Sequence, residues 1–175
     1  MRVFQITDPK EWGSAPGASQ PTASRIALLG FVGLALLVGV ADGALASGAA
    51  RIWVLSLNRP AGALTIAEFG PAWGVLQTSC GVAGWLAWRR AGAGTALRLW
   101  GWVLAAGAAR AAAFFGMHNL GLTIGIGAVM LGLLAALIRR FGAIHRPAAW
   151  LMVPSLLWTV YILYLDVGFL LLNPR

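Results

Sequence analysis

Residues 26–47 read IALLGFVGLALLVGVADGALAS, an apolar run whose single charged side chain is Asp42. A helix rises about 1.5 Å per residue, so about 20 apolar residues cross the roughly 30 Å hydrocarbon core of a bilayer. Apolar and polar residues do not alternate here, as they would in a strand of a membrane barrel. Because backbone polar groups in lipid must be paired within their own segment, the run predicts a transmembrane helix.

Four more runs of this kind follow, at residues 69–88, 97–117, 122–141 and 148–172. Together they predict an all-α membrane protein, a five-transmembrane-helix bundle formed by residues 26–175. Short connections join the last four spans, so consecutive helices are expected to be antiparallel neighbours, whereas residues 48–68 form a longer first loop. Residues 1–25 hold three prolines, several small residues and mixed charges, and are predicted to be a flexible cytoplasmic tail.

The composition excludes an ordinary soluble domain and a disordered chain. Of the 175 residues, 59% are apolar and 10% are charged, against about 45–50% and about 25% in an average soluble domain. One cysteine, Cys80, excludes an internal disulfide framework and a cysteine-rich metal site.

The net charge of +8 reflects membrane topology rather than a nucleic-acid-binding face, because the basic residues lie between the apolar runs. One side of the membrane receives Arg2, Lys10, Arg25, Arg89, Arg90, Arg98, Arg139, Arg140 and Arg146, and the other receives Arg51, Arg59 and Arg175. The positive-inside rule then places the N-terminus in the cytoplasm and the C-terminus outside, and the default membrane is the bacterial inner membrane. No nucleic-acid partner is expected.

Four ionisable residues lie in or next to the spans, all toward the first loop: Asp42, Glu68, Arg110 and Asp166. Charges at this depth are costly and usually face the bundle interior or water. We therefore expect one polar cavity in the outer half of the bundle, beneath the first loop. Arg110 either pairs with Asp166 or Asp42, or extends to the interface and leaves each aspartate hydrated.

Helical spacing assigns three faces to this cavity. They comprise Trp73, Gln77, Cys80 and Gly84 in the second span, Gly107, Arg110 and Phe114 in the third, and Ser155, Trp158 or Thr159, Ile162 and Asp166 in the fifth.

The nine tryptophans fall into groups. Trp85, Trp88, Trp100, Trp102 and Trp150 are predicted to be anchors at the cytoplasmic interface, and Trp12 lies in the tail. Trp53, Trp73 and Trp158 remain, and they are either core packing or the aromatic walls of a ligand pocket beneath the first loop.

Small residues recur every four positions in the third span, at Gly101, Ala105, Ala109 and Ala113. Such spacing lets helix backbones approach closely. The stripe predicts either the seam of a homodimer or close packing within the monomer.

Several motifs resemble the TspO/MBR family, the tryptophan-rich sensory proteins that include the mitochondrial translocator protein. They are Trp53, Leu57 and Pro60; the run FGPAWGVL at residues 69–76; GVAGWLAWRR at residues 81–90; Phe114-Phe115-Gly116; and Pro154 with Trp158, Tyr164-Leu165 and Leu172-Asn173. The resemblance covers about residues 26–174. It implies a five-helix bundle, often dimeric, that binds tetrapyrroles such as protoporphyrin IX, or apolar sterol-like and drug-like molecules, beneath the first loop.

The chain departs from the family pattern in the pocket. Gly62, Leu64 and Thr65 replace the aromatic and proline residues of the loop, Gln77 replaces a tyrosine, and Gly107 and Asp166 replace asparagines. Arg110 stands in place of a tryptophan, and the acidic residue usual near Gly125 is missing. About half of the pocket positions thus differ from the family pattern, and the differences make the pocket more charged.

From the residues and the resemblance we expect a membrane sensor or carrier with no required cofactor, whose ligand is an apolar planar molecule or a bound porphyrin. The candidate ligand-binding residues are Trp53, Trp73, Gln77, Gly107, Arg110, Phe114, Trp158, Ile162 and Asp166. The alternative is an accessory or assembly subunit of a larger membrane complex. An enzyme is the third reading, through light-dependent porphyrin breakdown that only the resemblance implies.

Overall fold

The computed structural model describes residues 21–174, and within them the chain forms helices and no strands. The helices are α1 (Pro21–Leu45), α2 (Gly48–Ser56), α3 (Ile66–Ala91), α4 (Thr95–Ala111), the π-helical turn η2 (Ala112–Gly116), α5 (Leu120–Ile144) and α6 (Arg146–Leu172). Most of the predicted tail, Trp12 included, and Arg175 lie outside the described residues.

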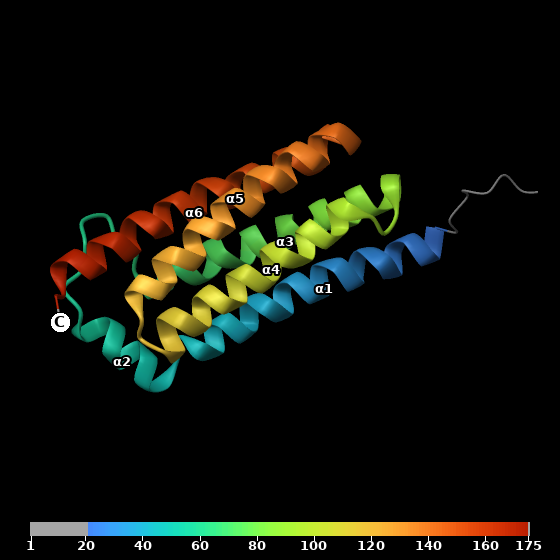
Figure 1. Cartoon of the computed structure of the whole chain (residues 1–175). Helices are drawn as coiled ribbons and strands as arrows, with labels where there is room; N and C mark the ends of the chain where they lie inside the picture. Colours follow the sequence, from blue (N-terminus) through green and yellow to red (C-terminus); the bar gives the residue numbers. More distant parts are fainter. Residues whose placement is uncertain (1–20, 175) are drawn as a thin grey trace, which may run out of the picture.

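The five long helices lie side by side along one axis, and the short helix α2 lies at one end of them (Figure 1). Around the bundle the packing order is α1, α3, α6, α5, α4 and back to α1. The end that carries α2 also holds the rest of the first loop, η2 and the end of α6 (Figure 1). We call it the α2 end, and the end with the α3–α4 and α5–α6 junctions the opposite end.

The predicted spans 69–88, 122–141 and 148–172 lie within α3, α5 and α6, whereas 26–47 runs two residues past α1 and 97–117 covers part of α4, all of η2 and Met117. Four stretches are long and apolar enough to cross a membrane: Ser24–Leu45, Thr95–Gly116, Leu120–Ile144 and Arg146–Leu172. The helix α3 has 26 residues but does not join this group, because it carries more polar and small residues. The chain is therefore an all-helical membrane protein, and the fifth span stays a prediction.

Among the described residues, helix α1 already includes residues 21–25, which were predicted to belong to the tail. The first loop, expected to be longer than the others, contains the nine-residue helix α2. Ala50 of this helix is buried, and the helix packs against η2, so tertiary contacts support it.

Small residues let α1 and α3 approach closely. A Cβ at Gly81 would lie 2.6 Å from the Cα of Val32, and a Cβ at Gly84 would lie 2.8 Å from the indole ring of Trp100. Trp100 is only 4% exposed and donates its Nε1–H to the carbonyl oxygen of Cys80 at 3.0 Å. The prediction that Trp100 anchors the cytoplasmic interface is therefore wrong. Its ring packs in the core, because Gly84 has no side chain to occupy that space.

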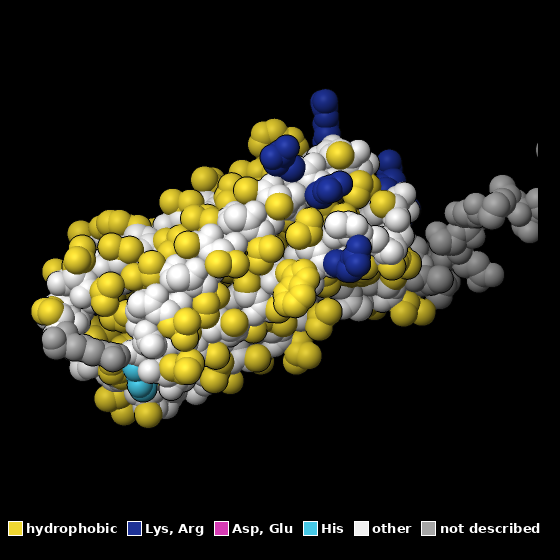
Figure 2. Space-filling view, viewed as in Figure 1, with side chains coloured by type: hydrophobic (Ala, Val, Ile, Leu, Met, Phe, Trp, Pro, Cys, Tyr) yellow, Lys and Arg dark blue, Asp and Glu magenta, His cyan; other side chains and the backbone are white. Residues whose placement is uncertain are grey.

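The surface suits a bilayer. Many large apolar side chains on the outside of the bundle are exposed, among them Leu29 at 72%, Val75 at 67% and Val129 at 62%. On the face in Figure 2 the dark blue Lys and Arg side chains gather at the opposite end, away from α2. An apolar flank with charges at one end is the pattern expected of a protein embedded in lipid.

Candidate functional site

A buried ion pair joins α4 to α6 in the half of the bundle nearest α2. Arg110 donates from Nη1 to Oδ2 of Asp166 at 2.9 Å, and the exposed fractions of their side chains are 15% and 3%. Beside this pair, Gly127 of α5 makes room for Leu163 of α6, since a Cβ at Gly127 would lie 2.7 Å from Cδ2 of Leu163. Of the two pairings that the sequence left open, the structure forms the one with Asp166.

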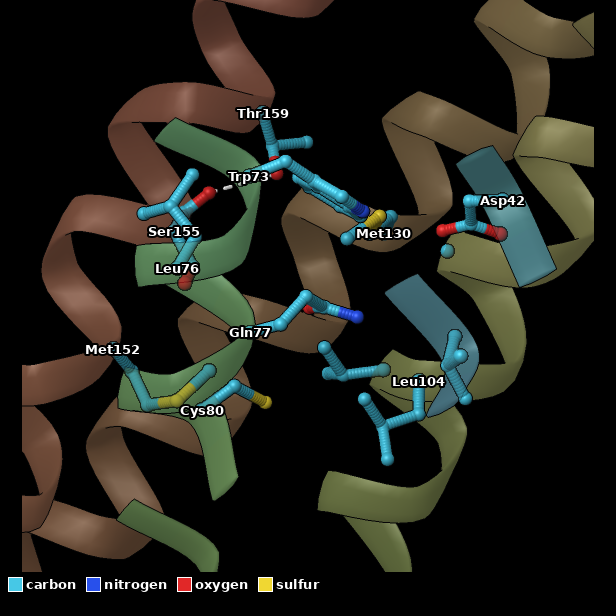
Figure 3. A pocket seen from close by; sticks show the side chains of 13 residues that line it. Asp42, Trp73, Leu76, Gln77, Cys80, Leu104, Met130, Met152, Ser155 and Thr159 are labelled. Carbon is cyan, nitrogen blue, oxygen red and sulfur yellow. Dashed lines mark hydrogen bonds between the residues drawn. The ribbon is translucent and has the colours of Figure 1, made fainter. Parts of the chain in front are cut away.

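An inner cavity lies among α1, α3, α4, α5 and α6. Its lining residues are Val38, Asp42, Trp73, Leu76, Gln77, Cys80, Val103, Leu104, Gly107, Met130, Met152, Ser155 and Thr159, and Figure 3 shows most of them pointing into one space. The cavity volume is about 20 Å³, which is room for roughly one water molecule. Of the predicted ligand-binding residues, Trp73, Gln77 and Gly107 line this cavity.

Two polar atoms at this cavity have no hydrogen-bond partner among the described residues: Nε1 of Trp73 and Oδ1 of Asp42. Two other polar side chains there donate hydrogen bonds, Gln77 to the carbonyl oxygen of Ala35 at 2.9 Å and Thr159 to that of Ser155 at 2.8 Å. Leaving a buried donor or acceptor unpaired costs about 1–3 kcal/mol. The N–H of Trp73 and Oδ1 of Asp42 are therefore available to a polar group that enters the cavity.

A separate apolar cluster fills the α2 end of the bundle. Phe114 and Ile162 are buried in it with Leu120, Leu165 and Phe169, and Trp53 packs against it. The ring centroids of Trp53 and Phe114 are 5.3 Å apart, and those of Trp53 and His118 are 4.3 Å apart. Phe114 and Ile162 thus belong to this apolar cluster, and Trp53 packs against it. None of the three lines the inner cavity.

Trp158 lies on a third feature, a lateral groove between α3 and α6. Gly62, Leu64, Ala72, Val75, Leu76, Pro154, Leu157, Trp158 and Tyr161 line it, with a volume of about 660 Å³. Leu76 lines both the groove and the inner cavity. The expectation that Trp53, Trp73 and Trp158 face one cavity is wrong, because the seam between α3 and α6 separates Trp158 from Trp73.

Phe69 links the two tryptophans across this seam. Its ring centroid lies 5.2 Å from that of Trp158 and 6.4 Å from that of Trp73. These three rings form a continuous aromatic wall from the groove toward the cavity. Pro154 also lines the groove, and its missing N–H interrupts the α6 hydrogen-bond ladder beside the opening.

The end of the first loop is fastened to α6 above the groove. The hydroxyl group of Tyr161 donates to the carbonyl oxygen of Gly62 at 2.9 Å and accepts from the N–H of Leu64 at 3.1 Å. Asn173 accepts from the N–H of Asn58 at 2.9 Å and donates to its carbonyl oxygen at 3.1 Å. The loop therefore forms a fixed rim of the groove.

The small-residue stripe is divided by the π-helical turn. Gly101, Ala105 and Ala109 are exposed on the outside of α4, whereas Ala113 in η2 is 1% exposed. A π-helix has more residues per turn than an α-helix, so it rotates Ala113 off the outer face and into the bundle. The predicted seam thus loses Ala113 and keeps the other three positions.

Sequence reasoning left Asp42 and Tyr161 out of the site. Asp42 was recognised as polar at depth, and the spacing of Pro154, Trp158 and Tyr161 by four and three residues would have marked the groove face of α6. Within residues 21–174, no three His, Cys, Asp or Glu side chains gather closely enough to hold a metal ion.

A comparison with known protein families matches residues 31–172 to the TspO/MBR family. The match covers most of the chain and includes α3, whose motif residues line both the groove and the cavity. No curated protein sequence matches the chain.

Proposed function

The chain belongs to the TspO/MBR family, and on that premise we propose that it is a membrane sensor or carrier that binds an apolar planar ligand between α3 and α6. The lateral groove carries this proposal. The groove is open along the flank, and its volume of about 660 Å³ leaves room for a ring system to lie against α3 and α6, whereas the inner cavity, at about 20 Å³, holds about one water molecule.

The groove suits a planar ring system such as a tetrapyrrole. Trp158 and Tyr161 supply aromatic surface, and Ala72, Val75 and Leu157 supply aliphatic surface. Because the groove opens on the flank of the bundle, an apolar ligand could enter from the bilayer without crossing water. No cofactor is required for folding in this proposal, and a bound porphyrin would be the ligand.

We also propose that α3 is the fifth span, that the N-terminus is cytoplasmic and the C-terminus outside, and that the membrane is the bacterial inner membrane. The helix α3 lies alongside α1 and α6 over the same length (Figure 1). The exposed arginines at the opposite end, which include Arg89, Arg90, Arg139 and Arg140, support this orientation through the positive-inside rule.

Protoporphyrin IX titrated into the purified protein tests the binding proposal, with the porphyrin absorbance band as the signal. Trp158→Ala should weaken binding about tenfold or more, because an aromatic contact contributes about 1–3 kcal/mol to stacking on a planar ring. Trp150→Ala is the matched control, since Trp150 is 71% exposed near the opposite end. Unsaturable binding, or equal loss in both variants, would contradict the proposal.

A second candidate role is a subunit of a homodimer or of a larger membrane complex. The exposed small residues Gly101, Ala105 and Ala109, next to Trp102 at 64% exposure, favour close contact with another helix. Purification in mild detergent separates the two forms: a homodimer fits the sensor or carrier, and a stoichiometric foreign partner fits the accessory subunit.

A further inference from the structure

Three ionisable side chains set the charge around the inner cavity, and of these Asp42 lines it. Arg110 is bonded to Asp166 at 2.9 Å, so its positive charge is already balanced. Asp42 is a second carboxylate, 7% exposed, and no ion pair reaches it among the described residues. Ionised, the three groups sum to one net negative charge, and Asp42 carries it at the cavity wall.

Asp42 of α1 and Trp73 of α3 both line this cavity (Figure 3). A Cβ at Gly39, one turn before Asp42 on α1, would lie 3.4 Å from Nε1 of Trp73, so the indole N–H approaches α1 about one turn from Asp42. In Figure 3 the indole nitrogen is at the end of the ring toward Asp42. A free donor and a free acceptor therefore border one small space.

A hydroxyl group satisfies both atoms, because it donates to the carboxylate of Asp42 while accepting from the N–H of Trp73. A ligand carboxylate does not suit Asp42. It has no proton to donate to the aspartate, and its negative charge repels the unbalanced charge of Asp42 in a region of low dielectric. An ester has no proton to donate either, but it meets no charge repulsion.

We propose that Asp42 is a specificity-determining residue that, with Trp73, holds the hydroxyl group of an apolar ligand and disfavours ligand carboxylates. The ligand's ring system lies in the lateral groove, and its polar end reaches past Leu76, which borders both spaces. This inference rests on the proposed binding function and names the class of ligand that the site takes.

Three porphyrins with one ring system test the inference at pH 8: protoporphyrin IX, its dimethyl ester, and the dialcohol in which both carboxylates are reduced to hydroxyl groups. The wild-type protein should bind the dialcohol most tightly, the ester less and the diacid least. In Asp42→Asn the diacid should gain about tenfold in affinity, while unchanged ester binding shows that the groove is intact. In Trp73→Phe the dialcohol should lose its advantage over the ester.

Glu68→Gln is the matched control, because it removes a carboxylate at the α2 end that is exposed and bonded to Thr65. It should leave the order of the three affinities unchanged. A wild-type protein that binds the diacid as tightly as the ester, or an Asp42→Asn variant with an unchanged ratio, would overturn the inference alone. Failure of all three porphyrins to bind would overturn the proposed function, and the inference with it.

Discussion

Replacing Arg110 by leucine should be among the most destabilising single changes in the bundle. Two unit charges about 4 Å apart attract by about 4 kcal/mol at an effective dielectric constant of about 20, and this attraction offsets the cost of burying Arg110 and Asp166. Asp166 is 2% exposed, so water cannot replace the lost partner. Removing one member of a buried pair costs about 3–5 kcal/mol, and we expect a loss in that range.

The double variant Arg110→Leu/Asp166→Leu should recover most of this loss, because it removes both charges and leaves apolar side chains in their place. Unfolding in mixed micelles with rising sodium dodecyl sulfate, followed by tryptophan fluorescence, measures the free energy of unfolding. Arg140→Leu is the control, since Arg140 is exposed near the end of α5, and its effect should stay within about 0.5 kcal/mol.

A single variant as stable as the wild type would refute the ion pair as a structural element. A double variant no more stable than the single one would show that shape, and not the unpaired carboxylate, causes the loss.

Further outcomes follow from the packing. Gly81→Ala should destabilise the bundle by about 1–3 kcal/mol, because the new Cβ would meet the Cα of Val32 at 2.6 Å. Gly74→Ala is the control: open space surrounds its Cβ, so this variant should be as stable as the wild type or more stable by up to about 1 kcal/mol. Equal effects of the two variants in the same unfolding assay would contradict the close approach of α1 and α3. Asn173→Ala should speed amide hydrogen exchange at residues 57–65, since it removes the bonds that hold this segment to α6, and unchanged exchange there would show that the tyrosine contacts suffice. Cys80, 3% exposed, should resist a membrane-permeant maleimide in the folded protein and react after unfolding, whereas rapid labelling of the native protein would place it outside the core.

The helices and the polar character of the α2 end could be predicted from local pattern. Long apolar segments form helices in lipid, because a helix pairs all of its backbone N–H and C=O groups within one segment, whereas strands do so only in a closed barrel. Because a buried charge is costly, the sequence also predicted that Arg110 could pair with an aspartate. The choice of Asp166 could not be predicted, since it depends on how α4 packs relative to α1 and α6, which brings Nη1 of Arg110 to 2.9 Å from Oδ2 of Asp166.

The sequence also could not predict that the candidate site residues divide among the inner cavity, the apolar cluster and the lateral groove. Helical spacing puts Trp73 and Trp158 on faces that meet, but it does not say on which side of the seam each ring lies. The π-helical turn rotates Phe114 into the apolar cluster and Ala113 away from the outer face. Regular spacing cannot anticipate such a change of period.

The sequence by itself determined that this protein is a helical membrane protein of the TspO/MBR family, because apolar length and the motifs around Phe69–Arg90 are local properties of the chain. Tertiary structure alone decided that one arginine is already neutralised by Asp166, that Asp42 is left with an unpaired oxygen, and that the aromatic groove lies beside the cavity. These are relations between side chains on different helices. They depend on how close two backbones come, which Gly81, Gly84 and Gly127 set only once the helices pack.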